Sequence, residues 1–196
     1  MSGKIKLNAG SGGGSFSLQA PSSSSNTRVL TLPDSADGTV ARTSDVKIVS
    51  YAIIADQKSA GTNGGAFTSG AWRTRDLNTE VTDVDNIVSL SSNRFTLQAG
   101  TYLIKGRATA YDCERHQLRI RNITDASTVR FGICNFLNTS YNPHNTAVIV
   151  GRTTITGAKE FELQHQAQTS KSNGGMGLGS NFTTEVFAEV EIYKEG

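Results

Sequence analysis

The chain has 196 residues, of which 36% are hydrophobic and 18% are charged, and its formal net charge is +2. This length fits one ordinary domain plus a further segment of about 40 to 50 residues, and it excludes a large multidomain enzyme. The 20 glycines and the small share of charged residues argue against a coiled coil. A charge this small and evenly spread is not typical of a nucleic-acid-binding protein, which would concentrate basic residues in one patch.

No stretch approaches the roughly 20 apolar residues that a membrane-spanning helix needs. The first residues also lack the apolar core of a signal peptide, so we expect synthesis in a cytosol and no membrane insertion. The two cysteines are Cys113 and Cys134. Without a secretory signal two free thiols are favoured, and a disulfide between them is the alternative.

Residues 1–45 are predicted to form an extended N-terminal arm, because Ser, Gly and Pro occupy 18 of these 45 positions. Three short apolar alternations interrupt the arm, and proline soon follows two of them. Such segments are typical of edge strands that pair with a neighbouring surface. A plain flexible linker is the alternative. The residues expected to anchor the arm on a partner are Ile5, Leu7, Phe16, Leu18, Val29, Leu30 and Leu32.

Residues 46–196 are predicted to form an all-β head domain, because strand-like runs alternate with turn clusters and no window has a helical period. The number of runs is typical of a two-sheet jelly-roll sandwich of ten strands. The strands are predicted at residues 46–56, 66–69, 72–82, 94–97, 101–110, 115–124, 127–136, 146–156, 160–168 and 184–194.

Most predicted strands have one apolar and one polar row, but the first and last strands of the head carry apolar residues in both rows. A strand that is apolar on both faces must bury both. The pattern therefore indicates a second protein surface, although a cover formed by the chain's own loops is an alternative. The residues predicted at a subunit interface are Val49, Tyr51, Ile53, Phe187 and Tyr193.

The order of these elements resembles the ten-stranded jelly roll of the tumour-necrosis-factor and complement globular-head superfamily. The likeness is carried by the first strand, a short strand at residues 65–72, an aromatic-plus-Gly-x-Tyr segment at residues 95–102, and a last strand that ends in Tyr193. This resemblance implies a homotrimer around a threefold axis.

Residues 67–79 and 115–119 are similar to domains at the ends of bacteriophage fibres and virion-surface proteins, especially those of cyanobacterial phages. The arm is similar to their attachment segments. The resemblance implies a protein of the virion surface, made in the bacterial cytoplasm, whose arm binds a phage capsid or tail protein. With only 45 residues before the head, a capsid decoration (cement) protein or short fibre is expected. A tail-fibre receptor-binding tip and a free carbohydrate-binding module are the alternatives.

Chemical motifs are sparse. His116, His144 and His165 have no metal-ligand spacing, and His165 falls on an apolar row, where a core role is favoured. No Gly-x-Ser-x-Gly motif joins a strand to a helix, and acidic residues in loops are usually solvated rather than a glycosidase pair. We therefore expect no catalytic residue, metal, cofactor or enzymatic activity, and a glycan-degrading enzyme is the alternative. The loops at the ends of the sandwich are instead expected to contact a host surface or its glycans. The candidate residues are Tyr111, Asp112, Tyr141, His144, Asn173 and Met176.

Basic residues on two consecutive predicted strands indicate a basic stripe on one sheet face. Attraction of an acidic polysaccharide is one interpretation, and pairing with nearby carboxylates is the favoured one. The basic residues are Lys105, Arg107, Arg115, Arg119 and Arg121, and the carboxylates are Glu160, Glu162, Glu189 and Glu191.

Overall fold

The computed structural model describes residues 4–8, 10–19, 23, 25, 48–136, 138, 140 and 143–196. The chain divides into two compact units, Met1–Val40 and Ala41–Gly196. The predicted boundary between residues 45 and 46 lies outside the described residues. So do four predicted site residues, namely Val29, Leu30, Leu32 and Tyr141.

The described part of the arm is a hairpin of β1 (Lys4–Asn8) and β2 (Ser15–Gln19). Its turn is rich in glycine, and Gly12 and Gly13 have φ values of +83° and +70°, which favour glycine. The register pairs Ile5 with Leu18 and Leu7 with Phe16. The first two apolar segments of the arm are strands, as predicted, and they pair with each other; the third lies outside the described residues.

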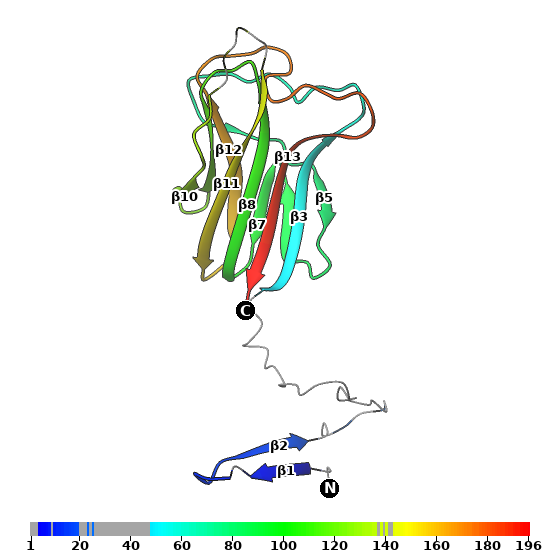
Figure 1. The fold of residues 1–196 in the computed structure, drawn as a ribbon, viewed down its shortest axis with the longest axis vertical. Helices are drawn as coiled ribbons and strands as arrows, with labels where there is room; N and C mark the ends of the chain where they lie inside the picture. Colours follow the sequence, from blue (N-terminus) through cyan, green and yellow to red (C-terminus); the bar gives the residue numbers. More distant parts are fainter. Residues whose placement is uncertain are drawn as a thin grey trace. The chain divides into compact units, whose positions relative to one another are not determined.

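The head is a sandwich of two antiparallel sheets, as predicted from the alternation of its strands. One sheet has the order β11-β8-β13-β3-β5, and the other has the order β10-β9-β12-β7-β6, with β4 paired to β12. Figure 1 shows β11, β8, β13 and β3 side by side, with β12 and β7 behind them.

The first sheet, called here the five-stranded sheet, consists of β3 (Ile48–Lys58), β5 (Thr79–Thr82), β8 (Gly100–Tyr111), β11 (His144–Ile155) and β13 (Glu185–Glu195). The second, called here the six-stranded sheet, consists of β4 (Arg73–Thr74), β6 (Val88–Ser91), β7 (Arg94–Leu97), β9 (His116–Asn122), β10 (Ser127–Phe131) and β12 (Lys159–Ala167).

The hydrophobic core lies between the two sheets and is built from alternate residues of their strands. The sheets approach closely at Gly106 on β8. A Cβ atom there would lie 2.9 Å from side-chain atoms of both Ile149 and Leu163, so only glycine fits without a shift. Fully buried core residues include Ile54, Phe95, Tyr102, Ile104, Leu118, Ile120, Phe161, Leu163 and Ile192.

Two predicted strands differ from the observed ones, and one observed strand was not predicted. The strand predicted at residues 72–82 is split into β4 and β5, which belong to different sheets. Residues 66–69 form only an isolated bridge between Phe67 and Lys171. The sequence analysis missed β6, whose hairpin with β7 turns at Ser92 and Asn93, both with positive φ. These values are typical of a two-residue hairpin turn, here without the glycine that usually signals one.

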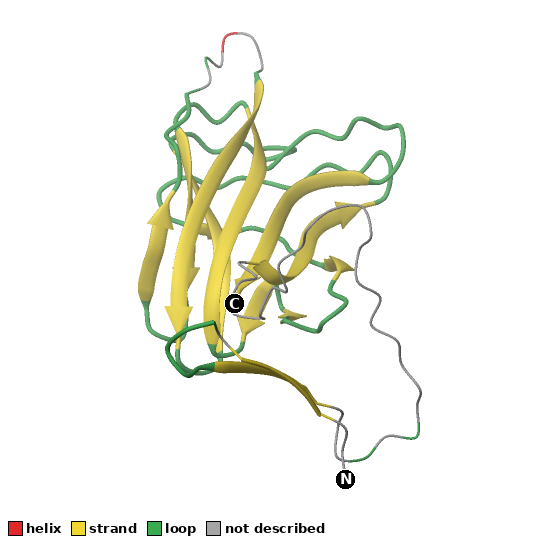
Figure 2. Ribbon diagram, turned by 60° about the horizontal axis from the view of Figure 1, so that its bottom comes forward, coloured by secondary structure: helices red, strands yellow, loops and turns green. Residues whose placement is uncertain are grey.

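The longest loops of the head gather at the end opposite the C-terminus, as the green segments of Figure 2 also show. In the part of the chain that the structure describes, no helix has the length and apolar character needed to cross a membrane. The loop end and the two outer sheet faces are therefore the surfaces considered for function.

Candidate functional site

The outer face of the five-stranded sheet, called here the five-strand face, has apolar residues along both flanks. On β3, Val49 and Tyr51 are 45% and 50% exposed, and Ile53 is half-buried. On β11, an edge strand on the far side of β8 and β13, Val148 and Val150 are 43% and 54% exposed. Val148 and Val150 pair with Arg107 and Lys105 of β8, so all four belong to the same outer row. Predicted interface residues thus lie on one flank, and the sequence analysis missed the other.

The centre of the five-strand face is charged, and its charges are paired. Arg107 forms an ion pair with Glu189, and Lys105 Nζ lies 3.8 Å from Glu191 Oε2. Lys105 also lies over the ring of Tyr193, 4.7 Å from its centroid. The predicted pairing of these two basic residues with carboxylates is confirmed. The five-strand face therefore combines apolar flanks with a centre in which the charged side chains are paired.

Phe187 corrects the predicted interface. It is only 3% exposed, whereas its neighbour Val186 is 46% exposed. The register between β13 and β3 shifts between Val186 and Ala188. Such a bulge adds one residue and re-aims the side chains around it, so that Phe187 and Ala188 are both buried. Phe187 is a core residue rather than part of the five-strand face.

The predicted basic stripe does not exist as one surface, because β8 and β9 belong to different sheets. On the outer face of the six-stranded sheet, Arg119 Nε donates to Gln164 Oε1 at 2.7 Å. Its guanidinium group lies over Trp72, 4.5 Å from the ring centroid. Glu160 and Glu162 are instead paired with Arg94, at 3.5 Å and 2.8 Å.

The Trp72–Arg75 segment is explained by packing within the head. Arg75 is fully buried, and its guanidinium donates to the carbonyl oxygens of Thr109, Met176 and Phe187 at 2.9 to 3.2 Å. Its backbone N–H donates to Leu163 O of the other sheet at 2.9 Å. Burial lowers the pKa of Arg75 to about 10, and this group therefore remains charged at neutral pH. This segment joins the two sheets and the loop end.

The predicted host-contact residues that the structure describes, all but Tyr141, lie at the loop end with different degrees of exposure. The rings of Tyr111 and His144 are 6.5 Å apart, and Asp112 forms an ion pair with Lys171. Asn173 is exposed and accepts a hydrogen bond from Asn63 at 3.1 Å. Met176 is half-buried against a small core cluster that includes Phe67. A role of these residues in host contact stays a prediction.

Two of the three histidines meet in the interior beneath the loop end. His116 Nδ1 lies 3.0 Å from His165 Nε2, and both side chains are buried. Burial lowers the pKa of His116 to about 4, and burial, with the charge of Arg75, lowers that of His165 well below its usual value. Both rings are therefore neutral near pH 7. Among the described residues, no group of three or more His, Cys, Asp or Glu could hold a metal ion.

The cysteines are free, as favoured by the sequence. Cys113 is fully buried, and burial raises the pKa of its thiol to about 11. Cys134 is exposed and lies 3.4 Å from Gln117 Nε2.

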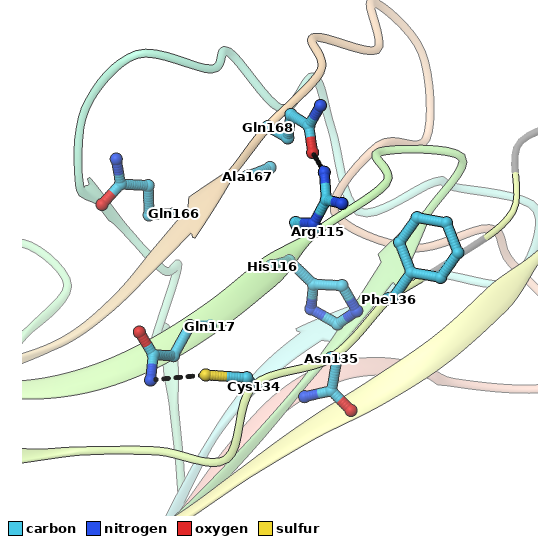
Figure 3. Close-up of a pocket in the computed structure, with 9 residues that line it drawn as sticks. All are labelled: Arg115, His116, Gln117, Cys134, Asn135, Phe136, Gln166, Ala167 and Gln168. Carbon is cyan, nitrogen blue, oxygen red and sulfur yellow. Dashed lines mark hydrogen bonds between the residues drawn. The ribbon is translucent and has the colours of Figure 1, made fainter.

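A pocket of about 530 Å³, which the sequence analysis missed, opens beside Cys134 (Figure 3). Three segments that are distant in sequence form it, and only the alternating glutamines near the end of β12 give a signal in the sequence. We call it the amide pocket. Its lining residues are Arg115, His116, Gln117, Cys134, Asn135, Phe136, Gln166, Ala167 and Gln168.

No protein-family model matches the chain, and no curated protein matches it. Several solved structures are similar to the chain. Mouse APRIL at pH 5.0 has a TM-score of 0.50 and 9% identity, covering 74% of this chain and 98% of that chain. The globular domain of zebrafish complement 1qA has a TM-score of 0.48 and 10% identity, covering 74% and 96%. The PRD1 vertex protein P5 has a TM-score of 0.45 and 12% identity, covering 76% and 99%.

At such identities the likeness concerns the fold. The APRIL structure matches over nearly its whole length, and the matched share of this chain corresponds in size to the head. Together with the two antiparallel sheets, this likeness shows that the head has a jelly-roll fold similar to that of the APRIL structure.

Proposed function

We propose that the head assembles as a homotrimer through the five-strand face, and that the protein is a non-enzymatic structural component of a virion surface. Its role is that of a capsid decoration protein or a short fibre, anchored by the N-terminal arm. The observation that carries the proposal is the pair of exposed apolar flanks, on β3 and β11.

Burial of this face is favourable for two reasons. Apolar side chains on both flanks would leave water, and each buried Å² of apolar surface contributes about 25 cal/mol. The charged side chains between the flanks already have partners, as in the pair of Arg107 and Glu189. An interface that covers them therefore buries paired rather than isolated charges, which lowers the cost of desolvation.

The separation of the flanks favours a ring. β3 and β11 lie on opposite sides of β8 and β13, so the two flanks are different surfaces of one head. When one surface of a subunit contacts a different surface of the next, repeated contacts close into a ring if the rotation allows it. A trimer in which the β3 flank meets the neighbour's β11 flank satisfies this condition.

The arm supports an anchoring role. Ile5 and Leu7 of β1 are exposed, and an isolated two-stranded hairpin is at best marginally stable in water. Each strand of the hairpin also has one edge free of the other strand, which can pair with an additional strand of a partner. A capsid or tail surface that accepts the hairpin would provide both kinds of contact. The similarity of the arm to phage attachment segments favours such a partner.

The assembly is tested by measuring the mass of the purified full chain in solution by light scattering. The expected result is three times the mass of one chain. Tyr51→Asp and Val150→Asp, one on each flank, should each give single chains, because each would place an unpaired carboxylate in the interface. Val84→Asp changes a valine that is 82% exposed outside the five-strand face and should leave the trimer intact. A wild-type chain that is monomeric at micromolar concentration overturns the proposal.

The virion role is tested by antibody labelling of purified particles in the electron microscope, with the full chain and with a chain lacking residues 1–45. We expect labelled capsids or fibres with the full chain, and unlabelled particles with trimeric but truncated chains. Label only at tail tips would favour the receptor-binding alternative. Unlabelled particles with both chains would contradict a virion role and favour a free carbohydrate-binding module.

A further inference from the structure

The amide pocket lies where β9 and β12 reach the loop end, and all of its lining residues come from one head. The pairing of Gln117 with Gln166 places two of them on neighbouring strands. Asn135 is brought to the wall by a backbone bridge to His116. The pocket is therefore complete without a second copy, and its role is independent of the proposed trimer.

The wall is rich in amide groups and has no carboxylate among its nine lining residues. Gln117 Nε2 donates to Gly132 O at 2.8 Å, and Asn135 Nδ2 donates to Ile133 O at 3.0 Å. These bonds fix both side chains while leaving their amide oxygens able to accept from a ligand. Gln166 is half-buried and has no hydrogen bond from its side chain among the described residues. The wall thus offers both donors and acceptors.

His116 forms a buried part of the pocket wall. His116 is only 3% exposed, its Nδ1 is used in the contact with His165, and its Nε2 has no partner among the described residues. In a neutral imidazole this nitrogen is either a donor or an acceptor, depending on which ring provides the shared proton. This nitrogen has almost no accessible surface, so recognition of a ligand falls to the amide groups of the wall.

Charge and an aromatic ring complete the pocket. Arg115 Nη1 donates to Gln168 Oε1 at 2.7 Å, and this contact is dashed in Figure 3. Arg115 forms no ion pair with a carboxylate of the described part of the chain, so its charge is available to a ligand. Its guanidinium lies 5.5 Å from the ring centroid of Phe136, which is 61% exposed. An exposed ring presents an electron-rich face to the C–H groups of a ligand.

We propose that the amide pocket binds a pyranose sugar that carries a carboxylate group, such as a uronic acid unit of a surface polysaccharide. The sugar ring lies against Phe136, its hydroxyls bond to the amide groups, and its carboxylate bonds to Arg115. Guanidinium and carboxylate groups form charge-assisted hydrogen bonds, which are stronger than neutral ones.

Binding is tested by titrating the full chain with glucuronic acid, using glucose and acetate as comparison probes, in an isotope-labelled NMR experiment. We expect glucuronic acid to bind with a dissociation constant on the order of 1 mM, and both comparison probes at least about tenfold more weakly. Equal binding of glucose would overturn the role of the charge. Equal binding of acetate would overturn the role of the sugar ring, and the absence of glucuronic acid binding would overturn the site.

Cys134 gives a second readout, because it lines the pocket and is exposed while Cys113 is buried. Glucuronic acid should slow the alkylation of Cys134 by iodoacetamide in proportion to occupancy. Alkylation at an unchanged rate under saturating sugar would contradict binding at this place, even if binding elsewhere is detected. Cys113 should stay unmodified in both conditions, which shows that the head remains folded.

Single substitutions test the contribution of each side chain of the amide pocket to binding. Phe136→Ala and Gln166→Ala should weaken glucuronic acid binding about tenfold, and Arg115→Gln should remove the preference over glucose. Phe182→Ala is the matched control, since Phe182 is 90% exposed and lies outside the pocket. It should bind like the wild type. If Phe182→Ala weakens binding as much as Phe136→Ala, the assignment is wrong. The trimer variant Tyr51→Asp should retain binding, so this proposal and the assembly can fail separately.

Discussion

The two outer faces of the head present different chemistry to a neighbour. The five-strand face has apolar flanks around paired charges, whereas the outer face of the six-stranded sheet is lined by amide and guanidinium groups such as Gln164 and Arg119. The first arrangement gains free energy when another protein surface removes water from it. The second leads to the amide pocket, whose amide groups a small polar ligand can contact.

The difference shows that one sandwich can divide two tasks between its sheets. A sheet that is buried on its inner side has its outer rows free to specialise, because alternate residues point to opposite faces. Assembly can therefore occupy β3, β8, β11 and β13 while the amide pocket on β9 and β12 remains open. Changes that act on one face alone, or on both together, test this division.

The largest loss of stability is expected from substitution of Arg75, because this residue forms hydrogen bonds to both sheets. Arg75→Met would remove the guanidinium donor from the carbonyl oxygens of Thr109, Met176 and Phe187, and the last two would share only the Thr109 hydroxyl. At about 1 kcal/mol for each lost hydrogen bond, the free energy of unfolding should fall by about 3 kcal/mol or more. Urea denaturation measures this loss, and both faces should lose their properties together.

Arg73→Met is the matched control for that change. Arg73 also donates to two carbonyl oxygens, those of Thr68 and Ser69, but its side chain is half-buried at the surface. Water can replace the lost donor there, so the loss should be under about 1 kcal/mol. Equal losses for the two variants would show that burial of Arg75 does not decide its contribution.

A smaller loss of stability is expected at acidic pH, and it should originate from the two buried histidines of the six-stranded sheet. In the folded head, burial lowers the pKa of His116 to about 4 and lowers that of His165 well below the usual value of about 6.5. Between pH 6.5 and 4 the unfolded chain therefore binds more protons than the folded one, and stability falls as the pH falls. The melting temperature should be several degrees lower at pH 5 than at pH 7.

The histidine pair is tested by the variant His116→Gln/His165→Gln, which keeps polar groups at both positions but cannot take up these protons. Its melting temperature should change less between pH 7 and pH 5 than that of the wild type, even if it is lower at both. An unchanged difference would assign the acid sensitivity to other groups.

The strand pattern was predictable because side-chain direction has a period of two along a strand. The rows of β8 and β12 could therefore be assigned from the sequence. Which strands share a sheet could not, because alternation contains no information on the partner. This explains the incorrect basic stripe: β8 and β9 are consecutive in the chain but belong to different sheets.

Irregularities of a single residue could not be predicted from the sequence either. The bulge near Phe187 moves this residue from the outer row to the core, and nothing in the local sequence marks the extra residue. The amide pocket depends on three segments, around Gln117, Asn135 and Gln166, that meet only through strand pairing and one backbone bridge. Its chemistry could be recognised only after the pairing of β9 with β12 was known.

The smallest effect is expected for the ion pair of Arg107 and Glu189 in a single chain. The Arg107 side chain is 56% exposed, and exposed pairs contribute about 0 to 1 kcal/mol. A double-mutant cycle with Arg107→Gln and Glu189→Gln, made in the monomeric Tyr51→Asp background, should give a coupling energy below about 1 kcal/mol in urea denaturation.

In the trimer the same pair should matter more, because an interface that covers the five-strand face removes water from both charges. Arg107→Gln alone would then leave Glu189 buried and unpaired, and it should raise the dissociation constant of the trimer about tenfold or more, corresponding to at least 1.4 kcal/mol. The double variant should recover most of this loss, since no unpaired charge remains. Equal coupling in monomer and trimer would mean that the pair stays in water, and that the interface lies on another face of the head.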